Sequence, residues 1–163
     1  MKVLGIDPGL QVTAYGVISV PAGLSGRKDP VLVEAGIVRT DARSGIAERL
    51  KKVHDSLSEL VAELKPDVLA IEKLYSHYAH PATAILMGHV RGVVCLVSGL
   101  KKVPLVSIAS THVKKAVTGK GHATKFQVQR MVQYHLGLPK LPEPPDVADA
   151  LAVAIAHVFS LRK

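Results

Sequence analysis

The stretch KVLGIDPGLQVTAYGVISV, residues 2–20, predicts a β-hairpin. Residues 2–6 are mostly apolar, Pro8-Gly9 is a turn pair, and residues 13–20 are rich in β-branched side chains. Asp7 therefore lies where the first strand ends. We expect two antiparallel strands at the start of the chain, with a carboxylate at their turn.

Outward from this hairpin, the chain continues as apolar strands and amphipathic helices. We expect a loop at 21–30, strands at 31–40, 68–71 and 103–108, helices at 46–64 and 81–100, a helix capped by Ser110, a helix capped by Thr124 and ended by Gly137, and a last helix starting at Asp146. This order predicts an α/β fold whose central mixed five-stranded sheet is flanked by helices. Residues 1–163 suffice for one domain.

The composition favours an aliphatic core and a polyanionic partner. The chain is 48% hydrophobic but only 4% aromatic, which is typical of parallel strands covered by helices. The formal net charge is +8, from 21 basic and 13 acidic residues. Such an excess attracts nucleic acid, although many basic domains bind none.

The cysteine content and the apolar runs point to the cytoplasm. Cys95 is the only cysteine, so no intrachain disulfide can form. The printed sequence begins with the first expected strand, and no uninterrupted apolar run reaches about 18 residues. We expect a cytoplasmic protein without a membrane partner.

Four carboxylates lie at the ends of apolar segments: Asp7, Glu72, Asp146 and Asp149. Charges at the edge of a core cost several kcal/mol unless they are paired or bind a metal. Asp146 and Asp149 are three residues apart and share one helical face. Oxygen ligands without cysteine favour Mg²⁺ or Mn²⁺, and two such ions about 4 Å apart can hold the attacking and leaving oxygens of a phosphodiester. The pattern predicts a magnesium-dependent nuclease.

Each acid also has an ordinary interpretation when it is taken alone. Asp7 before Pro8-Gly9 could initiate a turn, and Glu72 could be a solvated strand end. Asp146 could be a helix N-cap, with Asp149 favoured by the helix dipole. Their combination at three such edges favours the metal site.

Two further patterns have competing interpretations. Ala84, Gly88 and Gly92 form a stripe of small residues, which indicates either tight packing on the sheet, the favoured interpretation, or a helix contact with a second subunit. His77 and His80 have metal-like spacing without an evident third ligand, so we interpret them as solvated loop residues.

Five ordered blocks of the sequence are GIDPG at 5–9 with VTAYGVI at 12–18, AIE at 70–72, VK at 113–114, GKGHATK at 119–125 with QVQ at 127–129, and DVADALA at 146–152. Together they resemble the RuvC family of bacterial Holliday junction resolvases over almost the whole chain. The resemblance implies a ribonuclease H-like fold and a homodimer. It also implies Mg²⁺-dependent nicking of two like-polarity strands of a four-way DNA junction, which leaves ligatable 5′-phosphate ends. Mn²⁺ would be able to substitute, and the RuvA and RuvB branch-migration proteins are expected partners.

The resemblance also carries residue roles. It implies that the catalytic and metal-binding positions are Asp7, Glu72, Asp146 and Asp149, with Asp146 the least critical because some relatives have histidine there. It implies that DNA is contacted by Tyr75, Lys114, Lys125, Lys115 and Lys120. Tyr75 stands where relatives have an aromatic residue that stacks on an unpaired base, worth about 1–3 kcal/mol. The ordinary alternative for each lysine is a solvated side chain.

Our mechanistic hypothesis is that Asp7 bridges two Mg²⁺ ions and that Glu72 and Asp149 complete the sites. Two rivals remain open. One is a ribonuclease H-like nuclease that acts on structured RNA, and the other is a junction-binding module without catalysis, in which the acids only repel misplaced phosphates.

Overall fold

A five-stranded mixed sheet forms the centre of the computed structural model, which describes residues 1–21, 29–73 and 81–162. The strands are β1 (Lys2–Asp7), β2 (Val12–Ser19), β3 (Val31–Arg39), β4 (Val68–Glu72) and β5 (Leu105–Ile108), in the spatial order β3-β2-β1-β4-β5. β2 is antiparallel to both β1 and β3, whereas β1, β4 and β5 are parallel. The predicted mixed sheet of five strands is confirmed.

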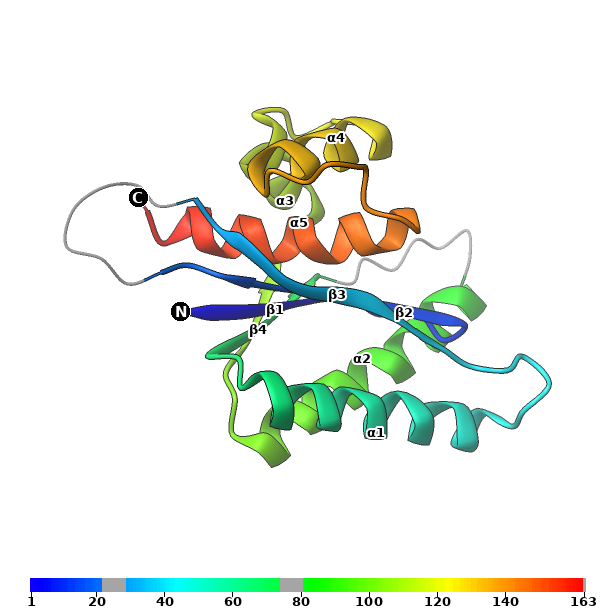
Figure 1. The fold of residues 1–163 in the computed structure, drawn as a ribbon. Helices are drawn as coiled ribbons and strands as arrows, with labels where there is room; N and C mark the ends of the chain where they lie inside the picture. The colour runs from blue at the N-terminus through cyan, green and yellow to red at the C-terminus, as the bar shows by residue number, and fades with distance from the viewer. Residues whose placement is uncertain (22–28, 74–80, 163) are drawn as a thin grey trace.

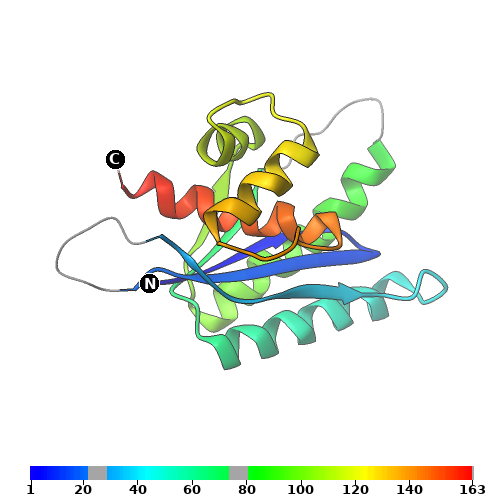
Figure 2. The ribbon, with the colours of Figure 1, turned by 45° about the horizontal axis from the view of Figure 1, so that its top comes forward.

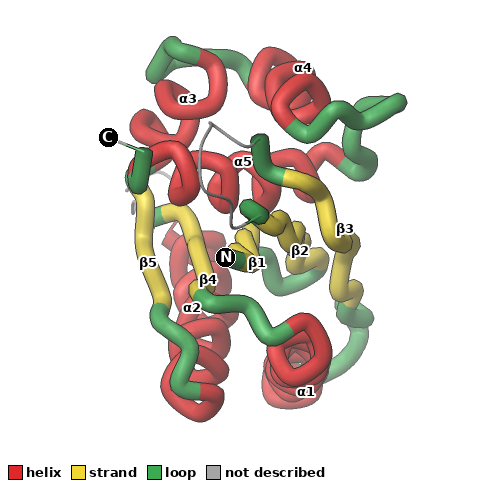
Figure 3. The backbone as a smooth tube through the Cα atoms, turned by 60° about the vertical axis from the view of Figure 1, so that its left-hand side comes forward, coloured by secondary structure: helices red, strands yellow, loops and turns green. Residues whose placement is uncertain are grey.

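Helices cover both faces of the sheet (Figures 1 and 3). They are α1 (Ile46–Leu64), α2 (Pro81–Lys101), α3 (Ser110–Thr118), α4 (Lys125–His135) and α5 (Pro145–Ser160). α1 and α2 lie on one face and α5 lies on the other, with α3 and α4 stacked on the outer side of α5 (Figures 1 and 2). A core of aliphatic side chains fills the space on each side of the sheet.

Helix α5 is buried along most of its length because it lies between the sheet and α3 and α4. A helix in that position needs apolar residues on all sides, which the run from Ala150 to Ala156 supplies. Two glycines let it approach the strands closely. A Cβ added to Gly5 of β1 would overlap the Ala150 carbonyl oxygen, and one added to Gly16 of β2 would overlap the side chain of Leu151.

Two helix starts differ from the prediction. The N-cap of α3 is Ala109, and Ser110, expected as the cap, is the first helical residue. α5 begins at Pro145, a position where the fixed φ of proline suits a helix start, so Asp146 is its second residue and not its cap. The expected Thr124 cap of α4 is confirmed, and its side chain accepts a hydrogen bond from the Gln127 N–H.

The small-residue stripe on α2 does not pack internally. Among the described residues, a Cβ added to Gly88 or Gly92 would meet no atom within 4 Å. α2 instead packs through Val90, Val94 and Val97, which are buried against α1 and the sheet. The interpretation favoured from the sequence is therefore wrong, because the apolar face that α2 buries lies on its other side.

The outer face of α2 is apolar and exposed. Its large exposed side chains are Ile85, Leu86, Leu96 and Leu100. In the described part of the chain, one helix segment, Ala82–Lys101, is long and apolar enough to cross a bilayer by length and composition, with a mean hydropathy of 1.6. The segment also contains Arg91, which bonds to groups on two strands, so one side of the helix belongs to the fold.

Candidate metal centre

The first two acids lie at the carboxyl ends of neighbouring parallel strands. Asp7 is the last residue of β1 and Glu72 the last of β4, and the register that pairs Ile6 with Ile71 puts them side by side. Side chains alternate along a strand, so Asp7 points to the same face as Gly5, which contacts α5. Both carboxylates therefore face the side of the sheet that α5 covers.

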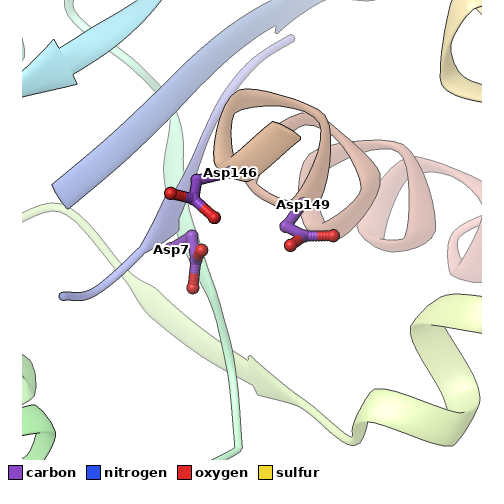
Figure 4. Close-up of side chains that lie close together, drawn as sticks. All are labelled: Asp7, Asp146 and Asp149. Carbon is purple, nitrogen blue, oxygen red and sulfur yellow. The ribbon is translucent and has the colours of Figure 1, made fainter. Parts of the chain in front are cut away.

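The other two acids come from the start of α5. Asp146 is in its first turn and Asp149 is one turn further on the same face. Carboxylate oxygens of Asp7, Asp146 and Asp149 all lie within 4.8 Å of one another (Figure 4). Residues separated by about 140 positions in the sequence thus converge because Gly5 lets α5 lie directly on β1.

This acidic cluster disfavours negative charge on Asp7. Burial, followed by the charges of Asp149 and Asp146, raises the pKa of Asp7 from its ordinary 3.8 to about 7, while Lys125 acts in the opposite direction. A divalent cation would remove this repulsion by pairing with all three carboxylates. The electrostatics are those of a site built to hold a cation.

Glu72 lies beside the cluster, although the three-residue group does not include it. Burial raises its pKa, whereas the Ser110 side chain lowers it, and the nearby charge of Asp149 raises it again. The positive charges of Lys114 and Lys125 also lower the Glu72 pKa. The glutamate is thus within electrostatic reach of the aspartates and is held toward α3.

Lys125 contacts the cluster directly. Its Nζ lies 3.1 Å from a carboxylate oxygen of Asp149, and the charge of Asp149 raises the Lys125 pKa. The Asp149 side chain is 29% exposed and the Lys125 side chain 74% exposed, so the lysine reaches the site from the solvent side. It partly balances the excess of negative charge there.

The donor set fits Mg²⁺ or Mn²⁺. Three carboxylates offer hard oxygen ligands at mutual distances that one or two ions can bridge, and no sulfur ligand is among them. Glu72, whose pKa is affected by the charge of Asp149, lies near enough to be a further candidate ligand. Asp7 at the end of β1 therefore lies together with Asp146 and Asp149, the two α5 residues predicted to share a ligand.

The predicted DNA contacts are distributed unevenly. Lys125 and Lys114 act on the acids, whereas Lys115 and Lys120 are exposed side chains on α3 and the turn after it. Tyr75, His77 and His80 lie outside the described residues, and His122 is exposed.

Sequence reasoning missed two residues that act on Glu72. Ser110 was interpreted as a helix cap, although a residue just after β5 lies at the same sheet edge as Glu72, and this position could have revealed it. Arg91 is the other. Its Nη1 donates to the Glu72 main-chain carbonyl at 2.6 Å, and no local pattern around Arg91 indicates such a partner.

This fold and these acids are those of a metal-dependent nuclease of the ribonuclease H-like class. A family described as "Crossover junction endodeoxyribonuclease RuvC" matches residues 3–157, and the chain belongs to this family. A relative with that description in Rhodopirellula baltica is 46% identical over 155 residues, which cover 94% of this chain and 83% of the relative.

Two solved structures agree with the assignment. A Thermus thermophilus RuvC structure is 33% identical, with a TM-score of 0.90, and the match covers 99% of this chain and 96% of that one. T. thermophilus RuvC in complex with Holliday junction substrate matches with a TM-score of 0.90 at 32% identity, covering 99% of this chain and 95% of that chain. The chain is therefore similar to these nucleases over nearly its full length.

Proposed function

We propose that this chain is a structure-specific endonuclease that resolves Holliday junctions in DNA recombination and repair. It nicks two strands of like polarity symmetrically and leaves ligatable 5′-phosphate ends. The observation that carries the proposal is the convergence of Asp7, Asp146 and Asp149, with Glu72 beside them, in a chain of this family.

The four acids would hold two Mg²⁺ ions, and Mn²⁺ would be able to substitute. The ions would supply an activated water and would neutralise charge on the scissile phosphate. Asp7 is central because Asp146, Asp149 and Glu72 all act on its charge, and its carboxylate would help to hold the metal. Glu72 and Asp149 would provide further ligands. Lys125 lies at the open side of the cluster, where its ammonium can bind a phosphate oxygen as charge develops.

The DNA lies across this sheet edge. Lys114 and Lys125 contact the backbone near the scissile phosphate, and Lys115 and Lys120 extend the basic surface. Tyr75, just after the catalytic glutamate in sequence, stacks on an unpaired base near the crossover.

The active form is a homodimer, because a junction with approximate two-fold symmetry requires two equivalent cuts. The exposed apolar face of α2 supports this proposal. Its exposed leucines offer apolar surface to a partner, and its glycines would let a second helix approach closely. We expect RuvA and RuvB to be partners and the cytoplasm to be the site of action, where DNA is available.

The test is nicking of a synthetic four-way junction in Mg²⁺, mapped to single nucleotides. Wild-type protein is expected to give paired symmetric nicks. Asp7→Asn is expected to bind the junction in Ca²⁺ but not to cut it, because it removes the central carboxylate. An RNA hairpin competing as well as the junction would favour the structured-RNA nuclease, and binding without cutting by the wild type would favour the non-catalytic module.

A further inference from the structure

The main-chain carbonyl of Glu72 lies where the β1–β4 ladder lacks a donor. The Lys73 N–H donates to β5, so the Glu72 carbonyl of the same peptide group faces β1. The register pairs Ile6 with Ile71, and a parallel ladder continued in this register would take its next donor from residue 8. That residue is Pro8, which has no N–H. β1, which supplies Asp7, therefore cannot donate a main-chain hydrogen bond to the Glu72 carbonyl of β4.

Arg91 of α2 supplies the missing donor. Its Nη1 donates to the Glu72 carbonyl at 2.6 Å, and its Nη2 donates to the Ser107 hydroxyl of β5 at 2.7 Å. A planar guanidinium that donates to two strands at once fixes both with one side chain. The hydrogen bond from a charged donor to a carbonyl is also stronger than a neutral one.

The two ends of Glu72 are held from opposite faces of the sheet. Its carboxylate faces the α5 side, where Ser110, Asp149 and the lysines act on it. Arg91 comes from α2, which lies on the opposite face of the sheet from α5 (Figure 3). Arg91 thus acts on the backbone from which the carboxylate projects.

We propose that Arg91 is a positioning residue of the nuclease site: it fixes the main chain at Glu72 so that the Glu72 carboxylate is aimed at the metal ions. The inference rests on the proposed metal role of Glu72. Without Arg91 the Glu72 peptide group would be held by β5 alone, and a small displacement of the backbone moves a ligand out of the short range of metal–oxygen bonds.

The experiment compares full-length Arg91→Gln, Arg91→Lys and Ser107→Ala with the wild type. Mn²⁺ affinity is measured by calorimetry. The Mg²⁺ midpoint, which is the Mg²⁺ concentration that gives half-maximal cutting, is measured in single-turnover experiments. Junction affinity is measured in Ca²⁺, without cutting. Arg91→Gln is expected to weaken Mn²⁺ binding and raise the Mg²⁺ midpoint about tenfold, the range seen for residues that orient metal ligands. Junction affinity should not change. Arg91→Lys keeps one donor and should restore part of the loss, and Ser107→Ala should have a smaller effect.

The proposal would be overturned if Arg91→Gln had the Mn²⁺ affinity and the Mg²⁺ midpoint of the wild type. It would also be overturned if junction affinity and the melting temperature fell together with metal binding, because that result indicates a general folding defect. If Arg91→Gln does not fold, Arg91→Lys and Ser107→Ala decide, and wild-type metal binding in both would overturn it. Asp7→Asn is measured alongside. Full cutting by that variant contradicts the proposed function itself, whereas a dead Asp7→Asn with an unaffected Arg91→Gln contradicts only the role of Arg91.

Discussion

At the scale of single residues, the site is defined by a carboxylate that the fold keeps in an unfavourable environment. Burial and the neighbouring aspartates raise the pKa of Asp7 to about 7. The metal-free protein therefore retains a proton there at pH values where an ordinary aspartate has lost it. A bound divalent cation reverses this preference, so binding of the metal and loss of the proton are coupled.

Asp7→Asn should stabilise the metal-free protein above neutral pH. A carboxyl whose pKa is higher in the folded than in the unfolded state contributes stability at low pH, and this contribution is lost as the pH rises from 3.8 to about 7. The shift corresponds to at most about 4 kcal/mol, and we expect on the order of 2 kcal/mol because water partly screens the site. The measurement is urea unfolding in EDTA at about pH 5 and pH 8.

The matched control for this prediction is Asp41→Asn. Hydrogen bonds from Arg43 lower the Asp41 pKa from its ordinary 3.8, so this carboxyl is ionised in both the folded and the unfolded state from about pH 5 to pH 8. Asp41→Asn should therefore show the same change in stability between the two pH values as the wild type. If the wild type and Asp7→Asn showed the same change in stability between the two pH values, Asp7 would not be in the environment described.

At the scale of elements, the contact between α5 and β1 assembles the site. The first two turns of α5 carry Asp146 and Asp149, and the helix reaches β1 because Gly5 has no side chain. Asp7, the third acid, is two residues after Gly5 on the same face of β1, so it lies beside this contact. The position of three carboxylates thus depends on one glycine.

Gly5→Ala is expected to destabilise the protein by about 3 kcal/mol or more, because the new Cβ would overlap the main-chain oxygen of Ala150, which cannot rotate away. Denaturant unfolding measures the loss. The folded fraction should also bind Mn²⁺ more weakly, since α5 must move from β1. Gly45→Ala, where a Cβ meets no described atom within 4 Å, should change stability by less than about 1 kcal/mol. Equal stability of the two variants would contradict the account.

The sequence predicted most elements because their signals are local. The apolar spacing of α1 and the capping box at Thr124 each lie within one helix, and both were located correctly. The acids that end β1 and β4 could be grouped because parallel strands end at one edge of a sheet. The RuvC-like blocks then indicated how the helix acids join them.

The failures concern contacts that span several elements. Whether Gly88 faces the sheet or the solvent depends on which side of α2 packs on α1. The sequence of α2 is apolar on all sides, so it does not indicate which side is buried. The partner of Arg91 depends on a missing donor at Pro8, more than 80 residues earlier in the chain. Ser110 as an effector of Glu72 likewise requires the order of the strands.

At the scale of the whole molecule, the site lies on one edge of the sheet and the unpartnered apolar surface lies on α2. A contiguous exposed apolar surface is typical of an interface, and α2 exposes Ile85, Leu86, Leu96 and Leu100. A net charge of +8 adds a long-range attraction to DNA that weakens with salt. The two features agree with the proposed dimer that binds a branched DNA.

Leu96→Glu is expected to prevent formation of the proposed dimer, because it places a charge on a side chain that is 53% exposed in one chain and would be buried in the proposed interface. Sedimentation measures the oligomeric state, and the junction assay should show single nicks replacing paired ones. Leu161→Glu, on a side chain 59% exposed after α5, should remain dimeric. A dimeric Leu96→Glu would exclude this face of α2 as the interface.

The central claim is that residues from both ends of the chain form one divalent-cation site. Anomalous diffraction from crystals soaked in Mn²⁺ at about pH 8, above the Asp7 pKa, tests it most directly. The account predicts manganese bound directly to the Asp7 carboxylate, with Asp149 and Glu72 completing the ligand set. Manganese bound elsewhere, with the Asp7 carboxylate free of metal, would contradict it.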